Sequence, residues 1–179
     1  MSTRLLFRGG LATFLLAVAV SAEAQRPVEL APNAPPDRPI SATLRCQVTA
    51  MMQAIAPLSA EARSTFPATR QRFEQGLPSR HTFFVSTWLR DSLGRQELAF
   101  VAVDSITGSD DELRIAGRIW NQIHVVRGFA FRHSYSFAIE ELVDWMIARP
   151  DGSEEGNEVD KFLDTYQPPA SCADTTEAG

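Results

Sequence analysis

The chain has 179 residues and carries 17 Lys or Arg against 22 Asp or Glu, which gives a net charge of −5 at neutral pH. Nucleic acids and anionic membranes attract basic surfaces, so this acidic composition argues against both as the main partner, and we expect no nucleic-acid partner. The residues after the N-terminal leader are enough for one domain with its own core, without a structural metal.

Residues 1–24 have the order of a secretory signal peptide. Arg4 and Arg8 precede the apolar run at 11–20, and Ala22 and Ala24 stand in the small-residue pattern of a cleavage site. A membrane anchor is the alternative, but the apolar run has half of the ~20 residues that a spanning helix needs. The sequence therefore predicts cleavage after Ala24, no stable membrane insertion, and a periplasmic or secreted protein.

A proline-rich linker and two helices come next. Residues 25–40 contain five prolines and little apolar periodicity, which predicts an extended linker. A helix is predicted from the N-cap Ser41 to Pro57, because five apolar residues share one face: Leu44, Val48, Met51, Met52 and Ile55. A second helix is predicted between Ser59 and Leu77, with Pro67 in a first turn and an end at Gly76-Pro78.

From residue 82 onward the apolar period falls to two, which is typical of strands. Five antiparallel strands are predicted: 83–89, 98–103, 113–119, 134–139 and one through Trp145 and Ile147. The D-S-L-G segment at 91–94 predicts a hairpin between the first two strands. A last helix is predicted over 158–166, with Asn157 as its cap and Asp160 at the third position. Residues 41–167 would form one domain, and residues 168–179 a polar tail.

Cys46 and Cys172 are the only cysteines. Cys46 would lie opposite the apolar stripe of the first helix, where a core cysteine has no place. Export and an even cysteine count favour an intramolecular Cys46–Cys172 disulfide. Two free thiols, or a link between two chains, remain the alternatives.

Reactive motifs are weak throughout the chain. Asp151, Ser153 and Glu155 imitate the start of a calcium loop, but Phe162 stands where the closing glutamate is required. His81, His124 and His133 lack zinc-site spacing, and no nucleophile motif is present in the sequence. We therefore predict no metal, no cofactor and no catalytic residue, although distant Ser, His and Asp side chains could still meet in space.

Two places could bind a partner. Arg114, Arg118 and Trp120 would share the outer face of the third strand, and Arg beside Trp is enriched at binding hot spots. A solvated outer face is the alternative for these residues. Asp144 and Trp145 could line a cleft, or Trp145 could anchor the core while Asp144 accepts backbone N–H groups. Asn121 is predicted to end the third strand through an Asx turn.

Residues 82–164 resemble a bacterial domain family of unknown function that is labelled YegJ-like. The matching residues are Gly117, Ile119 and Asn121 in a G-x-I-x-N run, Gly128-Phe129, the L-V-D-W-M-I segment at 142–147, and the DGSEEGN segment at 151–157. The resemblance covers roughly half of the exported chain. It implies a small, partly closed antiparallel sheet of SH3-like size, and it carries over no catalytic residue.

The sequence thus predicts one α+β domain, with two N-terminal helices on a five-stranded, SH3-like or barrel-like antiparallel sheet and one C-terminal helix. We expect a monomeric, non-catalytic binding or accessory module of the cell envelope, whose partner is an unidentified protein or envelope component. The competing hypothesis is a small periplasmic hydrolase with a non-contiguous Ser/His/Asp site.

Overall fold

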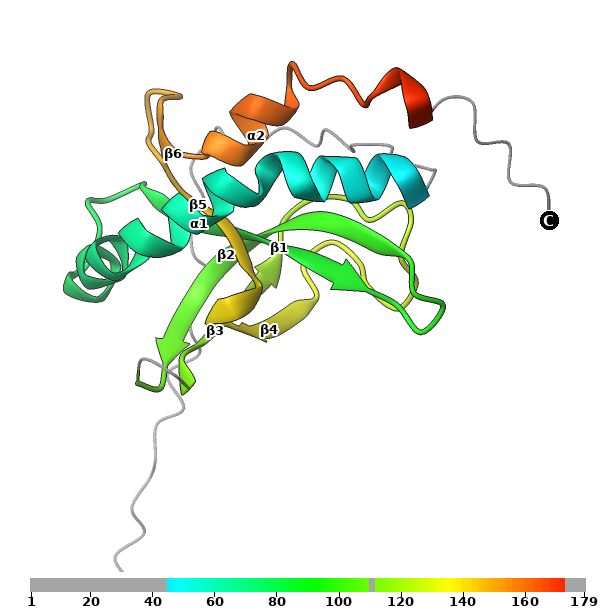
Figure 1. Cartoon of the computed structure of the whole chain (residues 1–179). Coiled ribbons are helices and arrows are strands. Elements are labelled where there is room, and N and C mark those ends of the chain that lie inside the picture. Colours follow the sequence, from blue (N-terminus) through cyan, green and yellow to red (C-terminus); the bar gives the residue numbers. More distant parts are fainter. Residues whose placement is uncertain (1–44, 110–111, 173–179) are drawn as a thin grey trace, which may run out of the picture.

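The computed structural model describes residues 45–109 and 112–172, which form a long helix, one antiparallel sheet and a short C-terminal helix (Figure 1). The elements in chain order are α1 (Arg45–Gln75), β1 (Thr82–Arg90), β2 (Gln96–Thr107), β3 (Arg114–Ile119), β4 (Ser134–Ala138), η2 (Ile139–Glu141), β5 (Leu142–Ala148), β6 (Glu154–Gly156), α2 (Glu158–Leu163) and η3 (Ala170–Cys172). The α+β class is confirmed. The leader, the linker and the final tail residues lie outside the described residues.

A single helix of 31 residues replaces the two predicted helices, because α1 continues through Pro57 and Pro67. Proline normally interrupts a helix by removing an N–H and crowding the preceding turn. Both prolines are exposed, and one continuous buried stripe runs past them along α1: Met51, Ile55, Ser59, Ala62, Phe66 and Thr69. Burial of that stripe offsets the proline cost and keeps the helix intact. Gly76, with φ of 95°, ends the helix as predicted.

The sheet has six strands in the order β4-β3-β2-β1-β5-β6, and every neighbouring pair is antiparallel. The predicted count of five is wrong because it omits β6, a strand of three residues. The edge strands β4 and β6 are not paired with each other, so the sheet is open and the barrel-like closure is also wrong. The SH3-like likeness itself stays a prediction.

Each face of the sheet carries its own apolar cluster. Odd-numbered Phe83 and Val85 of β1 face α1 and pack with Phe66 of that helix. The even-numbered Phe84 packs on the other face, in a cluster that also includes Ala102, Met146, Ala148, Phe100 and Trp120. The residues of the third strand that alternate with Arg114, Arg118 and Trp120 are all buried: Leu113, Ile115, Gly117 and Ile119. Alternation in the sequence therefore predicted the facing of this strand correctly.

The chain after β5 forms a tight hairpin and then α2. Gly156 of β6 lies opposite Met146, and a Cβ atom there would come within 2.3 Å of the Trp145 carbonyl oxygen and 2.8 Å of its ring. Only glycine allows β6 to approach Trp145 this closely. Figure 1 shows α2 beside α1, and the two helices are in contact. Within the described part of the chain, no helix is long and apolar enough to cross a membrane.

Candidate functional site

Trp120, the residue directly after β3, belongs to a stack of aromatic and cationic groups. The Trp120 ring lies 4.9 Å from the ring of Phe131 and 6.5 Å from that of Phe84. The Arg132 guanidinium lies 5.5 Å from the centre of the Trp120 ring and 5.1 Å from that of Phe131. We call Trp120, Phe131 and Arg132 the Trp120 stack. Arg132 is exposed and the two rings are half-buried.

Two backbone hydrogen bonds bring the distant residues of the stack together. The loop after β3 returns alongside the end of that strand, where Arg132 N–H donates to Ile119 O at 2.7 Å and Ile119 N–H donates to His133 O at 3.0 Å. Arg132 adopts a φ of 68° at this return. Sequence reasoning missed Phe131 and Arg132, because neither shares a strand with Trp120. The aromatic F-A-F-R segment at 129–132 was the only local signal.

Arg114 and Arg118 lie on the same strand face as predicted, but neither joins the stack. Arg118 makes a two-point ion pair with Asp104, at 3.2 Å from Nε to Oδ2 and 3.1 Å from Nη2 to Oδ1. Arg114 is exposed and its Nη2 donates to Ser136 O at 3.4 Å. Such surface pairs contribute about 1 kcal/mol or less. The cation that stacks on Trp120 is therefore Arg132, and the guanidinium of Arg118 is already paired within the chain.

Asn121 ends β3 by bonding to the neighbouring strand. Its Oδ1 accepts the Phe100 N–H at 2.8 Å, and the adjacent Trp120 N–H donates to Phe100 O at 2.8 Å. The side-chain carbonyl thus replaces the strand carbonyl that would otherwise meet β2. The predicted Asx turn is wrong because this hydrogen bond crosses strands instead of closing a local turn.

Asp144 of β5 is a buried carboxylate with a structural use. It is 3% exposed, its Oδ1 accepts the Trp145 N–H at 2.7 Å, and its Oδ2 accepts the Val159 N–H at 2.7 Å. Burial raises the pKa of Asp144 to about 6, against the opposing effect of these two hydrogen bonds. Asp144 therefore satisfies a free N–H in the first turn of α2 from another element.

Asn157 does not act as the predicted cap of α2. It lies at the capping position with a left-handed φ of 64°, and its side chain makes no cap hydrogen bond. Its Nδ2 donates instead to Glu154 Oε2 at 2.8 Å and to Asp160 Oδ2 at 3.4 Å. The left-handed backbone turns the side chain back toward β6, which leaves the capping role to Asp144.

Trp145 is half-buried between α1 and β6. Its Nε1 donates to Thr65 Oγ1 at 2.9 Å. A pocket of about 250 Å³ lies beside it, lined by Leu58, Glu61, Ala62, Thr65, Asp144, Trp145, Gly156 and Glu158. The lining has three carboxylates but neither a His nor a Ser, so the trio required for a hydrolase is not assembled at Asp144. Asp144 and Trp145 do border one pocket, as the cleft prediction required.

The acidic segment at 151–157 folds as a hairpin held by its own side chains. Asp151 Oδ1 accepts the N–H and the hydroxyl of Ser153 at 2.9 and 2.7 Å. Glu155 binds Arg72 of α1 and also Arg149, the latter at 2.8 Å, and the hydrogen bond from Arg72 lowers the Glu155 pKa. In residues 45–109 and 112–172, no three His, Cys, Asp or Glu side chains are grouped as metal ligands.

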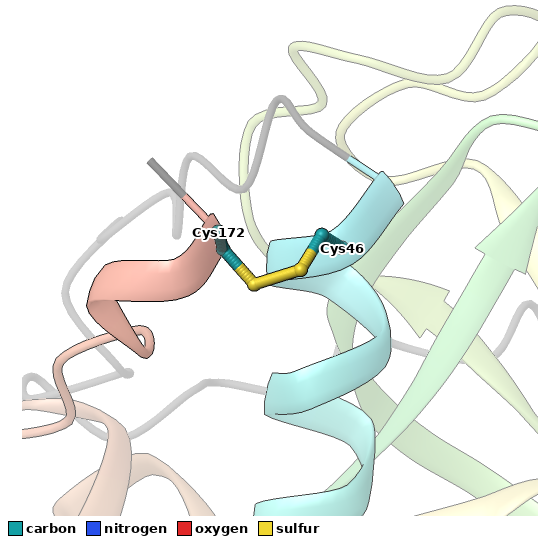
Figure 2. The surroundings of a disulfide bond; sticks show 2 residues. All are labelled: Cys46 and Cys172. Carbon is teal, nitrogen blue, oxygen red and sulfur yellow. A yellow bond between two sulfur atoms is a disulfide. The ribbon is translucent and has the colours of Figure 1, made fainter. Parts of the chain in front are cut away.

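The predicted disulfide is confirmed. Cys46 in the first turn of α1 is bonded to Cys172 in η3, with the two Cα atoms 5.6 Å apart (Figure 2). Cys172 is 2% exposed, whereas Cys46 is on the exposed side of α1, as its place opposite the apolar stripe predicted. The bond fastens the last described residues to the first helix.

Comparisons with known proteins add nothing to this site. No family model, curated protein or solved structure matches the chain. The resemblance of residues 82–164 to the YegJ-like family therefore stays a prediction.

Proposed function

We propose that this chain is an exported, non-catalytic binding module of the cell envelope whose binding surface is centred on the Trp120 stack. The predicted leader supports export, and the Cys46–Cys172 disulfide fits an oxidising compartment. The partner would be a protein or another envelope component that meets the module as a monomer. Membership of the YegJ-like family is part of this proposal, and adds no catalytic residue to it.

The observation that carries the proposal is the position of the Arg132 guanidinium over two aromatic rings. Arg and Trp are enriched at the energetic centres of interfaces, where a planar cation stacks and still presents N–H donors at its edge. Two rings fix the guanidinium, so little side-chain freedom is left to lose when a partner binds. Arg114 and Arg118 lie on the same strand face, with their guanidinium groups bonded to Ser136 O and to Asp104.

The hydrolase hypothesis lacks a comparable observation. Asp144 is the described carboxylate with the raised pKa, yet both of its oxygens accept backbone N–H groups. His124 and His133 lie in the loop after β3, while Asp144 lies on β5, and β2 and β1 stand between β3 and β5 in the sheet. The binding-module hypothesis is therefore the better supported of the two.

Capture from envelope extract tests the proposal. The exported protein is immobilised, and bound components are quantified for the wild type, Arg132→Ala and Arg132→Lys. We expect Arg132→Ala to reduce the specific partner about tenfold or more, because truncation of a hot-spot residue costs about 2 kcal/mol. Arg132→Lys keeps the charge but loses the planar stack, so an intermediate loss is expected.

Arg80→Ala is the matched control, since Arg80 is an exposed arginine just before β1 and belongs to no stack that we describe. The double variant Arg118→Ala/Trp120→Ala extends the test to the predicted face, after its melting temperature has shown that it folds. A partner retained equally by Arg132→Ala and by Arg80→Ala would refute the Trp120 stack as the binding surface.

A further inference from the structure

The two exposed large hydrophobic side chains in the described part of the chain are gathered at one end of the sheet. Leu93 is 70% exposed and Val125 is 41% exposed. Leu93 belongs to the hairpin between β1 and β2, and Val125 to the loop after β3; the two segments come to the same end of the sheet (Figure 1). We call Leu93, Val125 and the exposed Arg90 and Arg127 the apolar tip.

Asp91 ties the two segments of the apolar tip together. Its carboxylate accepts the backbone N–H groups of Leu93 at 2.9 Å, Arg95 at 3.0 Å and Arg127 at 3.1 Å, and the Nε of Arg95 at 2.7 Å. The side chain of Asp91 is only 3% exposed. The negative charge of Asp91 is thus covered by the backbone that it organises.

Glu97 does the same for the loop after β3. Its carboxylate accepts the N–H groups of His124 and Val125 at 2.8 Å each and that of Val126 at 3.1 Å, and the residue is 9% exposed. The hairpin turn closes with Gly94 N–H donating to Asp91 O at 3.0 Å. The backbone that presents Leu93 and Val125 is therefore held in place from inside the protein.

These hydrogen bonds suit the tip to a medium poor in water. Six backbone N–H groups around Leu93 and Val125 have carboxylate acceptors within the chain. An unsatisfied N–H is costly in a lipid environment, and this arrangement avoids that cost. A water-exposed loop would not require such internal acceptors, because water supplies its hydrogen bonds.

The exposed charges at the apolar tip have the opposite sign to the net charge of the whole protein. The chain carries a net charge of −5, but the exposed charges here are Arg90 and Arg127, while the carboxylates of Asp91 and Glu97 are covered. Long arginine side chains can bury their stems in an apolar layer and keep the guanidinium at a polar boundary. Cations beside protruding aliphatic side chains match a bilayer surface that displays phosphates.

We propose that the apolar tip docks the protein reversibly on the surface of an anionic lipid bilayer. Leu93 and Val125 enter the headgroup region, and Arg90 and Arg127 bind lipid phosphates. An acidic protein would offer the same charge, but a convex pair of aliphatic side chains needs a complementary pocket on a protein, whereas lipid chains rearrange around it. The overall net charge argues against an anionic membrane as the main partner of the entire surface, and the proposal concerns this tip alone.

Co-sedimentation with vesicles tests the proposal. The exported protein is mixed with vesicles of phosphatidylglycerol and phosphatidylethanolamine, or with vesicles of phosphatidylcholine alone. Removal of residues 1–24 is first checked by mass spectrometry, because the apolar run at 11–20 would itself bind lipid. We expect binding to the anionic vesicles that weakens with salt, and at least several-fold weaker binding to phosphatidylcholine.

Three variants assign the binding to the tip. Leu93→Asp and Arg127→Glu should each lower the partition coefficient on anionic vesicles about tenfold, the first by removing an apolar anchor and the second by reversing a charge. Arg80→Glu makes the same charge change before the start of β1, at the opposite end of that strand from Arg90, and should have little effect. Leu93→Trp should bind more tightly, with a blue shift and quenching by brominated lipid that report entry into the bilayer.

Several outcomes overturn the proposal: no sedimentation of the wild type with anionic vesicles, equal binding to phosphatidylcholine, or a Leu93→Asp protein that binds as the wild type does. Leu93 is largely exposed, so its variants should keep the wild-type melting temperature. Leu93-dependent binding to an acidic protein, with no binding to vesicles, would show that the tip is a protein interface and that the lipid proposal is wrong.

Discussion

Removal of the Cys46–Cys172 disulfide should cost this protein a large part of its stability. The bond joins residues 126 positions apart, and for a loop of that length the chain-entropy model gives about 5 kcal/mol at 25 °C. Small domains have total stabilities of about 5–15 kcal/mol, so the loss is comparable with the whole margin. Fraying of η3 and the residues before it in the reduced protein would bring the cost below this value.

The double variant Cys46→Ser/Cys172→Ala makes this measurement. Serine suits the exposed position and alanine the buried one, which is 2% exposed. Urea unfolding of the variant and of the oxidised wild type gives the difference in free energy, and the slope with urea should be larger for the variant because its unfolded chain is no longer cross-linked. Reduced wild type should match the variant, and reductant should leave the variant unchanged. A difference below about 1 kcal/mol would show that the disulfide does not stabilise the protein by restricting the unfolded chain.

Three further predictions concern Asp144, Gly156 and Glu97. The pKa of Asp144 is raised from 3.8 to about 6, so between these pH values the folded state binds a proton that the unfolded state has released. The free energy of unfolding should therefore fall by about 3 kcal/mol as the pH rises through this window. Urea titrations at several pH values should show this slope for the wild type and not for Asp144→Asn. Gly156→Ala should cost about 1–3 kcal/mol more than Gly152→Ala, since both glycines have positive φ but only Gly156 approaches Trp145; equal melting temperatures would contradict this. Glu97→Gln leaves at least one of the three N–H groups at 124–126 without an acceptor, which should lower the free energy of unfolding by about 1–3 kcal/mol. Amide hydrogen exchange at 124–126 should become faster in this variant. Unchanged exchange would show that another group holds the loop.

Local patterns in the sequence were sufficient for most of the sheet. Alternation of apolar and polar residues located β1 to β5 and showed which side chains of β3 are buried. Successive side chains of a strand point to opposite faces of the sheet, so burial of one face appears in the sequence as a period of two. β6 escaped prediction because it has three residues, two of them glutamates, and its pairing with β5 rests on Gly156 passing close to Trp145. The sequence predicts a helix end at Pro57 and the first turn of a second helix at Pro67, although the buried stripe continues past both prolines and indicates a single helix.

The candidate site depended on contacts that no local pattern contains. Trp120 could be selected from its strand, but Arg132 reaches it only because the loop after β3 returns beside Ile119. Asp144 was predicted to accept backbone N–H groups, and it does, yet one of them belongs to Val159 in α2. The two cysteines were paired correctly because a chain with only two offers one intramolecular choice.

The strand order also bears on how the protein folds. β1 to β4 are consecutive both in the chain and in the sheet, whereas β5 skips back to pair with β1. Pairing of consecutive strands closes short loops at a small cost in chain entropy, so the meander of β1 to β4 can form early. Pairing of β5 with β1 closes a much longer loop and is therefore slower. Because α1 packs on β5 as well as on β1, docking of the long helix is complete only after β5 has paired with β1. β1 therefore takes part in both stages of folding: it pairs with β2 in the fast stage and with β5 in the slow one.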